Sequence, residues 1–323
     1  MSVKQATLDL LEKNKGEYVS SKIICHKLNV TRAAVWKAIN TLKEEGYKIS
    51  SKSNMGYCLC HECDILSSES IKPYFTVDKN LFEIQCFKTL ESTNDYAKDL
   101  ASNGACEGTV VIAEEQTKGR GRLNRNFFSP GNTGIYMSLI LRPHIKADES
   151  LCITTAAAVA VCNAIESVMN KKVSIKWVND IFYKNKKVCG ILTESAFNCE
   201  IGTLDYVVLG IGINVKAPQE GFPDELSKIA CSLSENCASD IRSRLVACIL
   251  ENFWLYYMEL TDKKYLSSYI KYCSFLGKDI DIITNNGSVP AKALEICDDF
   301  SLVALTNDGN KLKLNCGEIS IKL

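Results

Sequence analysis

The residues best suited to chemistry lie in a short stretch that alternates glycine and arginine, Gly119-Arg120-Gly121-Arg122, with a third arginine at Arg125. Arginine offers paired donors that stay charged and fit phosphate or carboxylate, and glycine lets the main chain approach a ligand closely. The pattern predicts an anion-binding loop that is mobile until a negative ligand orders it. A solvated basic turn has the same composition, so these residues alone leave both interpretations open.

Residues 115–143 as a whole resemble the signature of biotin–protein ligases, EQxxGRGRxGRxWxSPxGxxLYxSxxLRP. The matches are Gln116, Gly119, Arg120, Gly121, Arg122, Arg125, Ser129, Pro130, Gly134, Tyr136, Ser138, Leu141, Arg142 and Pro143. Asn124 stands where the family usually has glycine, and Phe127 where it usually has tryptophan. Asparagine tolerates left-handed backbone better than most residues, so the first departure is tolerable.

A second motif, residues 176–180, reads KWVND and resembles the family's KWPND, with Val178 in place of proline. The resemblance implies that Lys176 neutralises the charge that builds as the biotin carboxylate attacks the α-phosphate of ATP. A solvent-facing lysine is the alternative.

The run Ser92-Thr93-Asn94 follows a predicted strand and begins a predicted helix, and helix capping by itself explains such a run. In the ligase family this element lines the biotin pocket. Hydroxyls and an amide suit a ureido ring, which has two N–H donors and a carbonyl, and Gln116 would complete this polar end.

The strand at 205–215 resembles the family's GIGINV strand, whose small residues admit the adenylate. The loop at 216–233 would close over the adenine, with Phe222 or Trp177 packing on the base.

Taken together, the resemblance implies catalytic roles for Lys176, Arg122 and Arg120. It implies a ligand-binding set made of Ser92, Thr93, Asn94, Gln116, Gly119, Arg120, Gly121, Arg122, Lys176, Trp177, Asn179, Gly190, Gly212 and Asn214. The small molecules would be biotin, as substrate, and ATP with Mg²⁺, whose protein ligands the sequence does not identify.

Strands must hold these motifs in place, and the hydrophobic pattern predicts such strands. Residues 109–113 and 133–141 predict two strands of one sheet on either side of the arginine loop, and 173–194 predict a hairpin with its turn at 184–186. Residues 148–169 predict a long helix packed on the sheet. Short alternating strands from Gly277 onward predict a small β-barrel.

The N-terminal residues have a different pattern. Helical spacing over three short segments, capped at Ser20 or Ser21 and at Thr31, predicts a helix-turn-helix, and two strand-like pieces up to Cys60 predict a wing. Residues 1–60 hold ten Lys and Arg against five Asp and Glu, which points to nucleic acid at this end. This segment resembles the winged helix of biotin ligases that also repress transcription.

Five polar residues of the third helix are available to meet DNA: Thr31, Arg32, Lys37, Asn40 and Thr41. A winged helix kept as a structural or regulatory appendage is the alternative, because fold alone does not establish activity.

The sixteen cysteines are scattered through apolar runs, which favours reduced thiols over a disulfide framework. Cys58, Cys60, His61 and Cys63 are close together, but their spacing does not match the usual paired knuckle of a metal site, and whether they bind metal stays open. We find no 18-residue apolar run and no signal-peptide layout, and we therefore expect a soluble cytoplasmic protein.

The predicted fold class is α/β: a winged helix-turn-helix at 1–62, a linker at 63–80, a mixed-sheet ligase domain of the biotin/lipoate type at 81–272 and an SH3-like β-barrel at 273–323. The resemblance implies a biotin–protein ligase that acts on a biotin carboxyl carrier domain. It also implies a biotin-responsive repressor that binds operator DNA as an adenylate-dependent homodimer.

Two alternatives remain. A lipoate–protein ligase shares this domain and its chemistry, although the arginine loop and the KWVND motif argue against it. A ligand-sensing transcription factor with a decayed ligase centre would be supported by Asn124, Phe127 and Val178.

Overall fold

The computed structural model describes residues 2–143, 145–198, 203–235, 238, 240–284, 287–315 and 317–321. Its chain forms two compact units. The first consists of Met1–Lys79 together with Cys237–Ala247, and the second of Asn80–Asn236 together with Cys248–Leu323.

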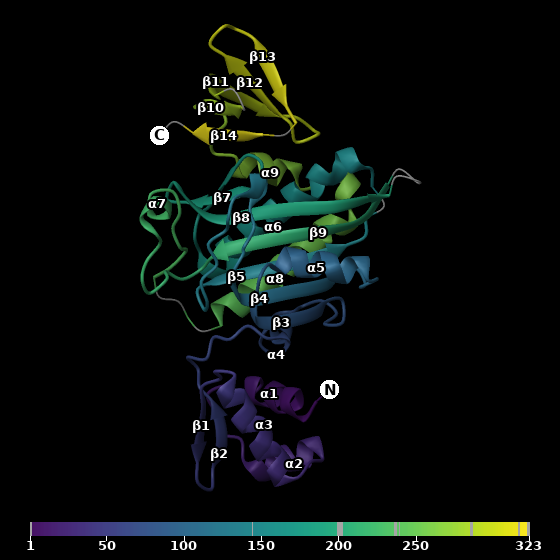
Figure 1. Ribbon diagram of the computed structural model, residues 1–323, viewed down its shortest axis with the longest axis vertical. Helices are drawn as coiled ribbons and strands as arrows, with labels where there is room; N and C mark the ends of the chain where they lie inside the picture. The colour runs from purple at the N-terminus through teal and green to yellow at the C-terminus, as the bar shows by residue number, and fades with distance from the viewer. Residues whose placement is uncertain are drawn as a thin grey trace. The chain divides into compact units, whose positions relative to one another are not determined.

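The first unit begins with three helices, α1 (Val3–Glu12), α2 (Ser21–Leu28) and α3 (Arg32–Glu44), followed by the hairpin β1 (Ile49–Lys52) and β2 (Gly56–Leu59) (Figure 1). Ser20 and Thr31 begin α2 and α3, since each hydroxyl accepts a backbone N–H three residues ahead. Asn29 has a φ of 51° and ends α2, which allows the tight turn into α3. The predicted helix-turn-helix with a wing is confirmed.

The first unit also contains the short helix α4 (Ser68–Ile71), the 3₁₀ turn η1 (Lys72–Tyr74) and the start of α8 (Ile241–Met258). Arg242 is fully buried there, with its Nε 3.1 Å from Asp64 Oδ2. A buried charge needs such a partner, so this pair fixes the start of α8 against residues 64–70.

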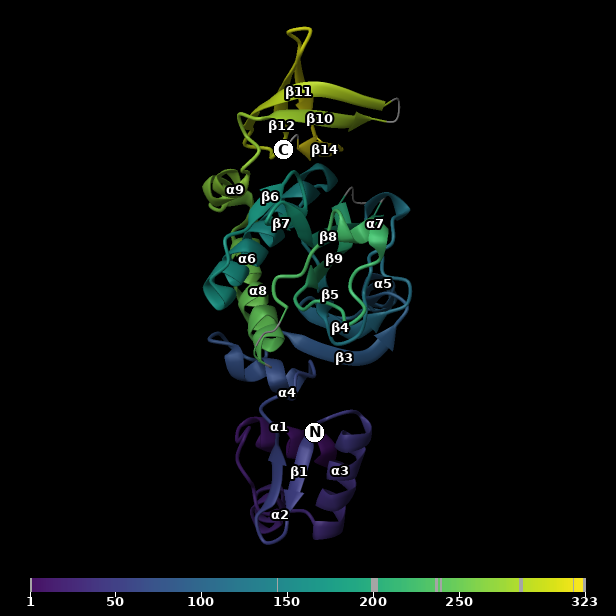
Figure 2. The same cartoon turned by 90° about the vertical axis from the view of Figure 1, so that its left-hand side faces the viewer.

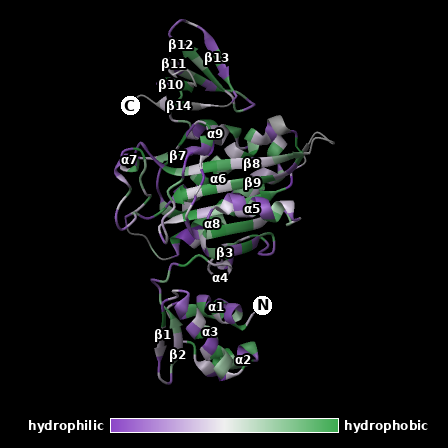
Figure 3. Cartoon of the chain, viewed as in Figure 1, coloured by the Kyte–Doolittle hydropathy of each residue, from purple (hydrophilic) through white to green (hydrophobic). Residues whose placement is uncertain are grey.

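The second unit is built on a seven-stranded sheet in the order β3-β4-β5-β9-β8-β7-β6. Its strands are β3 (Glu83–Leu90), β4 (Thr109–Gln116), β5 (Gly134–Leu141), β6 (Ser174–Lys176), β7 (Asp180–Tyr183), β8 (Lys186–Asn198) and β9 (Thr203–Asn214). β3 and β4 are parallel and the other neighbours are antiparallel, which confirms the predicted mixed sheet. Its central strands are strongly hydrophobic (Figure 3).

Helices cover both faces of this sheet (Figure 2). The crossover helix α5 (Thr93–Ser102) packs on β4, β5 and β9, and α6 (Leu151–Met169) packs on β6, β7 and β8 from the other side. The remaining short elements are η2 (Arg122–Asn124), η3 (Ala147–Ser150), α7 (Asp224–Ser227), η4 (Leu260–Asp262) and α9 (Leu266–Tyr272).

One helix is long and apolar enough to span a membrane by length and composition. It is α6, with a mean hydropathy of 1.7, and 72% of that window is buried inside the protein. Threonines and one glutamate interrupt a strictly apolar run, and the helix predicted at 148–169 and packed on the sheet is confirmed. Its burial against the sheet is that of a core helix.

A second, five-stranded antiparallel sheet ends the chain, in the order β13-β12-β11-β10-β14. Its strands are β10 (Asp279–Thr284), β11 (Gly287–Ile296), β12 (Leu302–Thr306), β13 (Lys311–Leu314) and β14 (Glu318–Ile321). The buried ring of Phe300 stacks on Tyr265 and meets Tyr269 edge-on, and its carbonyl accepts from Trp177 Nε1 at 2.9 Å. These contacts join the small sheet to the KWVND motif.

Candidate functional site

A cavity of about 570 Å³ in the second unit collects the predicted ligand-binding set. Every member of that set lines it except Gly119, which lies just behind, where an added Cβ would meet Phe127 O at 2.4 Å. The walls are formed by the start of α5, by β8 and β9, by residues 120–123 and 125–128 of the arginine loop, and by residues 222, 226 and 228–230. The topology therefore brings together motifs that are far apart in the sequence.

One end of the cavity is polar because α5 begins there. Thr93 and Asn94 are each 4% exposed, and Thr93 donates to Gln116 Oε1 from its backbone N–H at 2.8 Å and from its hydroxyl at 3.0 Å. Ser92 has a capping role, since its hydroxyl accepts from Asp95 N at 3.3 Å. Capping and ligand contact are therefore compatible within one three-residue run.

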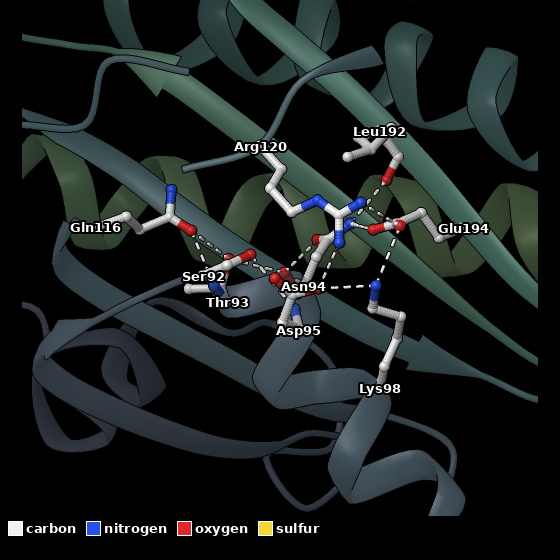
Figure 4. Close-up of polar contacts among 10 residues, drawn as sticks. Ser92, Thr93, Asn94, Asp95, Lys98, Gln116, Arg120, Leu192 and Glu194 are labelled. Carbon is white, nitrogen blue, oxygen red and sulfur yellow. Dashed lines mark hydrogen bonds and ion pairs between the residues drawn. The ribbon is translucent and has the colours of Figure 1, made fainter. Parts of the chain in front are cut away.

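Arg120 turns toward carboxylates at this polar end (Figure 4). Its Nη1 lies 2.6 Å from Asp95 Oδ1 and its Nη2 lies 3.6 Å from Glu194 Oε1. Burial raises the pKa of Asp95, but hydrogen bonds from Lys98 and Arg120 outweigh it and hold that pKa below its ordinary value. A phosphate could replace these carboxylates as the partner of Arg120, because all of them offer anionic oxygen acceptors.

Arg122 has different partners. Its Nη1 donates to Asn179 Oδ1 at 2.7 Å, and its Nη2 donates to Gly317 O at 3.0 Å. Asn179 in turn donates to Ile191 O at 2.7 Å. Arg122 thus ties the arginine loop to the KWVND motif and to the C-terminal sheet, a connection that the sequence did not indicate.

The backbone of the loop explains one departure from the family pattern. Leu123 and Asn124 have φ values of 53° and 56°, so both adopt left-handed backbone. Glycine adopts this conformation freely and asparagine tolerates it. The family's glycine can therefore become Asn124 without a change of loop shape.

Glycines of the sheet make room for side chains of the site. A Cβ on Gly210 would lie 2.1 Å from Asn94 Oδ1, and one on Gly212 would lie 2.6 Å from the Phe127 ring. Gly190 is nearby, where a Cβ would lie 3.4 Å from the same ring. Phe127, at the family's tryptophan position, therefore packs over β8 and β9.

Four lysines line the cavity, Lys176, Lys187, Lys228 and Lys278, and the first two lie at the KWVND motif and its hairpin. Lys176 Nζ lies 5.5 Å from the centre of the Phe182 ring, and Lys187 Nζ lies 2.7 Å from Asp180 Oδ1. Lys187 was missed by the sequence analysis, because it follows a turn rich in lysine, where a solvated charge is the ordinary interpretation. The predicted hairpin places Lys187 opposite the KWVND motif, and this position could have identified it as a site residue.

Both aromatic residues predicted to pack on a base line the cavity, but they differ in exposure. Trp177 is 2% exposed, follows β6 and forms a cis peptide bond with Val178. Phe222 lines the cavity, and its ring centre lies 6.1 Å from that of Phe128. Phe222 is therefore the better placed of the two for contact with a planar ligand.

Four of the predicted DNA-contacting residues lie on α3 in the first unit, and Thr31 is the N-cap of that helix. Thr31, Arg32 and Lys37 are exposed, whereas Asn40 and Thr41 are half-buried. Trp36, which the sequence analysis did not select, is 61% exposed on the same helix. A large apolar side chain so exposed is a feature of contact surfaces.

Across the described ranges, no group of three or more His, Cys, Asp and Glu side chains could hold a metal ion. Cys58 and Cys63 are buried, and the ring of His61 packs where a Cβ on Gly16 would lie. Every cysteine in the described part of the chain is free. The buried ones act as small core side chains.

Two family models match this chain. Residues 86–214 match the Biotin/lipoate A/B protein ligase family, and residues 4–58 match an HTH domain. The first match holds the cavity's motifs from α5 to β9, and the second holds the three N-terminal helices and the wing.

Full-length relatives and solved structures agree with this division. The chain is 35% identical over 314 residues to the bifunctional ligase/repressor BirA of Bacillus subtilis, which covers 96% of each chain. It is 26% identical to that of Escherichia coli, covering 95% of this chain and 94% of the relative. A biotin protein ligase from Aquifex aeolicus in complex with biotin and ATP is similar over 74% of this chain and 98% of its own, with 25% identity and a TM-score of 0.59.

Proposed function

The chain belongs to the bifunctional ligase/repressor BirA family, and from this premise we propose how its residues carry out the two activities. It is a biotin–[acetyl-CoA-carboxylase] ligase and a DNA-binding repressor. The observation that supports the site assignment is the cavity itself, which has buried hydroxyl and amide groups at one end and cationic side chains along its walls.

The reaction has two steps. A carboxylate oxygen of biotin attacks the α-phosphorus of ATP, the bond to the β-phosphate breaks, and biotinyl-AMP and pyrophosphate form. The amine of an acceptor lysine on a carrier domain then attacks the acyl carbon, and AMP leaves as the amide forms. Because the acceptor brings the nucleophile, the protein needs none, and its cysteines have no catalytic role.

We assign the ureido end of biotin to Thr93, Asn94 and Gln116. Lys176 and Lys187 flank the position of the reacting carboxylate and α-phosphate, where they stabilise the negative charge that develops. Losing one such preorganised donor costs ~3 kcal/mol of transition-state stabilisation.

The two loop arginines hold the anionic part of the adenylate. Arg120 exchanges Asp95 for the ligand, and Arg122 keeps the loop attached to Asn179. Closure of the loop over the mixed anhydride excludes the water that would hydrolyse it.

Magnesium enters with ATP in this proposal. Mg²⁺ keeps several waters and binds substrate phosphates with one or two carboxylates. That coordination agrees with the lack of a clustered metal site among the residues that the structure describes.

The ligase assignment is tested by incubating the protein with biotin, MgATP and a biotin carrier domain, and measuring AMP release and transfer of labelled biotin. Lys176→Met is expected to reduce the adenylation rate at least about 100-fold. Lys118→Met is the matched control, since Lys118 pairs with Glu91 and both side chains are 71% exposed. Equal rates in the two variants would contradict the role of Lys176, and preferential use of lipoate in a competition assay would overturn the choice of acid.

We also propose that the protein is cytoplasmic and that its domains end near residues 62 and 272, with a linker up to residue 80. The domains cooperate in DNA binding as follows. Adenylate-dependent ordering of the arginine loop favours a homodimer, and the dimer presents two winged helices to a palindromic operator. Thr31, Arg32, Lys37, Asn40 and Thr41 contact that DNA. Sedimentation should show more association with biotin and MgATP than without them, and no change in association would rule out this coupling.

A further inference from the structure

We infer that Trp36 determines part of the DNA sequence preference, because its indole ring contacts the C5-methyl group of a thymine in the major groove. Trp36 is the fifth residue of α3, and 61% of it is exposed. The inference rests on the proposed contact of α3 with operator DNA, and it adds the kind of base that this helix reads.

The indole of Trp36 lies outside the core of its unit. That core takes the other side of α3, where Val35, Ile39 and Leu42 are each at most 1% exposed. Over the ranges that the structure describes, Trp36 Nε1 donates no hydrogen bond, and the ring stacks on no aromatic ring or cation. The core therefore forms without the indole, which stays available for contact with a ligand.

The charge around Trp36 fits a polyanion. Residues 31–43 carry three basic side chains, Arg32, Lys37 and Lys43, and no acidic one. Lys43 Nζ lies 3.0 Å from Ser51 Oγ on β1, which brings positive charge to the wing (Figure 1). Phosphates are attracted to such a surface, whereas the cores of protein interfaces are depleted of charged residues. DNA is therefore the partner that this side of α3 fits.

Trp36 lies in one row with two residues that are proposed to contact DNA. Arg32 is four residues before it and Asn40 is four residues after it, and residues at this spacing are neighbours on one side of a helix. In a helix-turn-helix, the N-terminal residues of the second helix meet base edges in the major groove. A ring as large as indole between Arg32 and Asn40 must then contact base edges or keep the helix out of the groove.

The chemistry of the major groove selects the base. The C5-methyl group of thymine is the one apolar group that base edges present there, and it lies beside the O4 acceptor of the same base. Indole matches this pair, since it has an apolar face and a single N–H donor. The other bases present polar groups without this methyl, and covering them with the ring costs free energy that no hydrogen bond offsets.

The test uses the full chain with biotin and MgATP. Duplexes that it binds are selected from a random library, and each thymine of the selected site is then replaced in turn by deoxyuridine, which lacks only the methyl group. Fluorescence anisotropy at one salt concentration measures the Kd. For the unsubstituted protein, at least one replacement should raise the Kd about fourfold, the effect of exposing one buried methyl group.

Substitutions of Trp36 connect that methyl group to the indole. Trp36→Ala should bind the thymine duplex at least about tenfold more weakly than the unsubstituted protein. It should not distinguish the thymine duplex from the uracil duplex, because the methyl group then has no partner, and Trp36→Phe should keep part of the preference. Ile23→Ala is the matched control, since Ile23 is 48% exposed on α2, outside the row, and this variant should keep the whole preference.

Each outcome decides the inference. A thymine preference lost in Trp36→Ala and kept in Ile23→Ala supports it. A preference that both variants keep, or both lose, overturns it while the repressor assignment stands, as does a selected site in which uracil replaces every thymine without effect. Enrichment of no sequence at all overturns the proposed operator contacts as well.

A direct measurement covers the case in which circular dichroism melting shows that Trp36→Ala is misfolded. Binding of the selected duplex should protect the tryptophan fluorescence of the unsubstituted protein from acrylamide quenching, because Trp36 is covered by DNA. The same duplex should give Trp36→Phe no such protection. Equal quenching of the unsubstituted protein with and without the duplex would overturn the inference.

Discussion

Arg120 and Arg122 stand two residues apart in one motif, yet they meet different partners. Arg120 contacts two carboxylates, which an anionic ligand can replace, whereas Arg122 contacts a neutral amide oxygen and a main-chain carbonyl. When a ligand replaces these carboxylates, Arg120 loses ion pairs at a partly exposed site, and such pairs contribute little to stability. The two arginines therefore have separable roles.

Arg122→Gly should lose adenylate retention while the protein still folds. The substitution removes the bond to Asn179, which holds the loop to the KWVND motif, and the bond to Gly317, which holds it to the second sheet. Labelled biotin and MgATP followed by rapid gel filtration will measure the adenylate that stays bound. Lys118→Met should retain it as the unsubstituted protein does, and full retention in Arg122→Gly would refute the assignment.

Asp95 makes a contribution to stability that depends on pH in a defined direction. Its pKa is lowered in the folded protein, so its stabilising effect is complete above the unfolded pKa of about 3.9 and is lost as pH falls below that value. The difference in unfolding midpoint between the unsubstituted protein and Asp95→Asn should be constant from about pH 7 to 5 and shrink below about pH 4. A difference that grows on acidification would contradict this sign.

At the scale of elements, two connections decide the geometry of the site. The crossover from β3 through α5 to β4 places a helix start beneath the arginine loop, and the β7–β8 hairpin brings Lys187 beside the KWVND motif. The turn between β11 and β12 adds Phe300, whose carbonyl holds Trp177. Each element contributes little alone, and their pairing builds the cavity.

The arginine loop offers a test of backbone conformation. Because Asn124 has a φ of 56°, Asn124→Gly should leave adenylate retention unchanged or improved, and Asn124→Ala should destabilise the closed loop by about 1 kcal/mol. The rate at which bound adenylate escapes measures this directly. Similar escape from the glycine and alanine variants would show that this left-handed residue does not limit closure.

At the scale of the whole molecule, the two units divide the chemistry. Basic excess is concentrated in residues 1–60, so the remainder of this electrically neutral chain carries an equal acidic excess. Nucleic acid is attracted to the basic residues 1–60 and not to the acidic remainder of the chain. The ligase cavity is lined by the second unit alone.

Arg32→Ala should therefore weaken operator binding and leave biotin transfer unchanged. Each DNA phosphate that the protein no longer neutralises reduces the salt dependence of DNA affinity by about one unit of slope. Fluorescence anisotropy over a range of salt concentrations, with a transfer assay on the same preparation, measures both. A parallel loss of ligase activity would contradict the division between units.

The sequence by itself determined the parts whose signal is local. Caps at Ser20 and Thr31 and the alternating strands follow from residue types and short spacings, and the motifs at 115–143 and 176–180 identified the ligand chemistry. The hairpin turn predicted at 184–186 is one residue shorter in the structure, because Lys186 already pairs with Tyr183. The backbone at Asn124 also follows the expected tolerance of asparagine for left-handed conformations.

Only the tertiary structure decided which distant residues meet. The partners of Arg122, and the contacts that link Glu194, Asn94, Ser138 and Thr93, join segments that are far apart in the sequence, and no local pattern encodes these contacts. The same holds for α6, whose apolar sequence suits a membrane or a core equally well. Packing against the sheet resolved that ambiguity, because burial is a property of the folded chain and not of the segment.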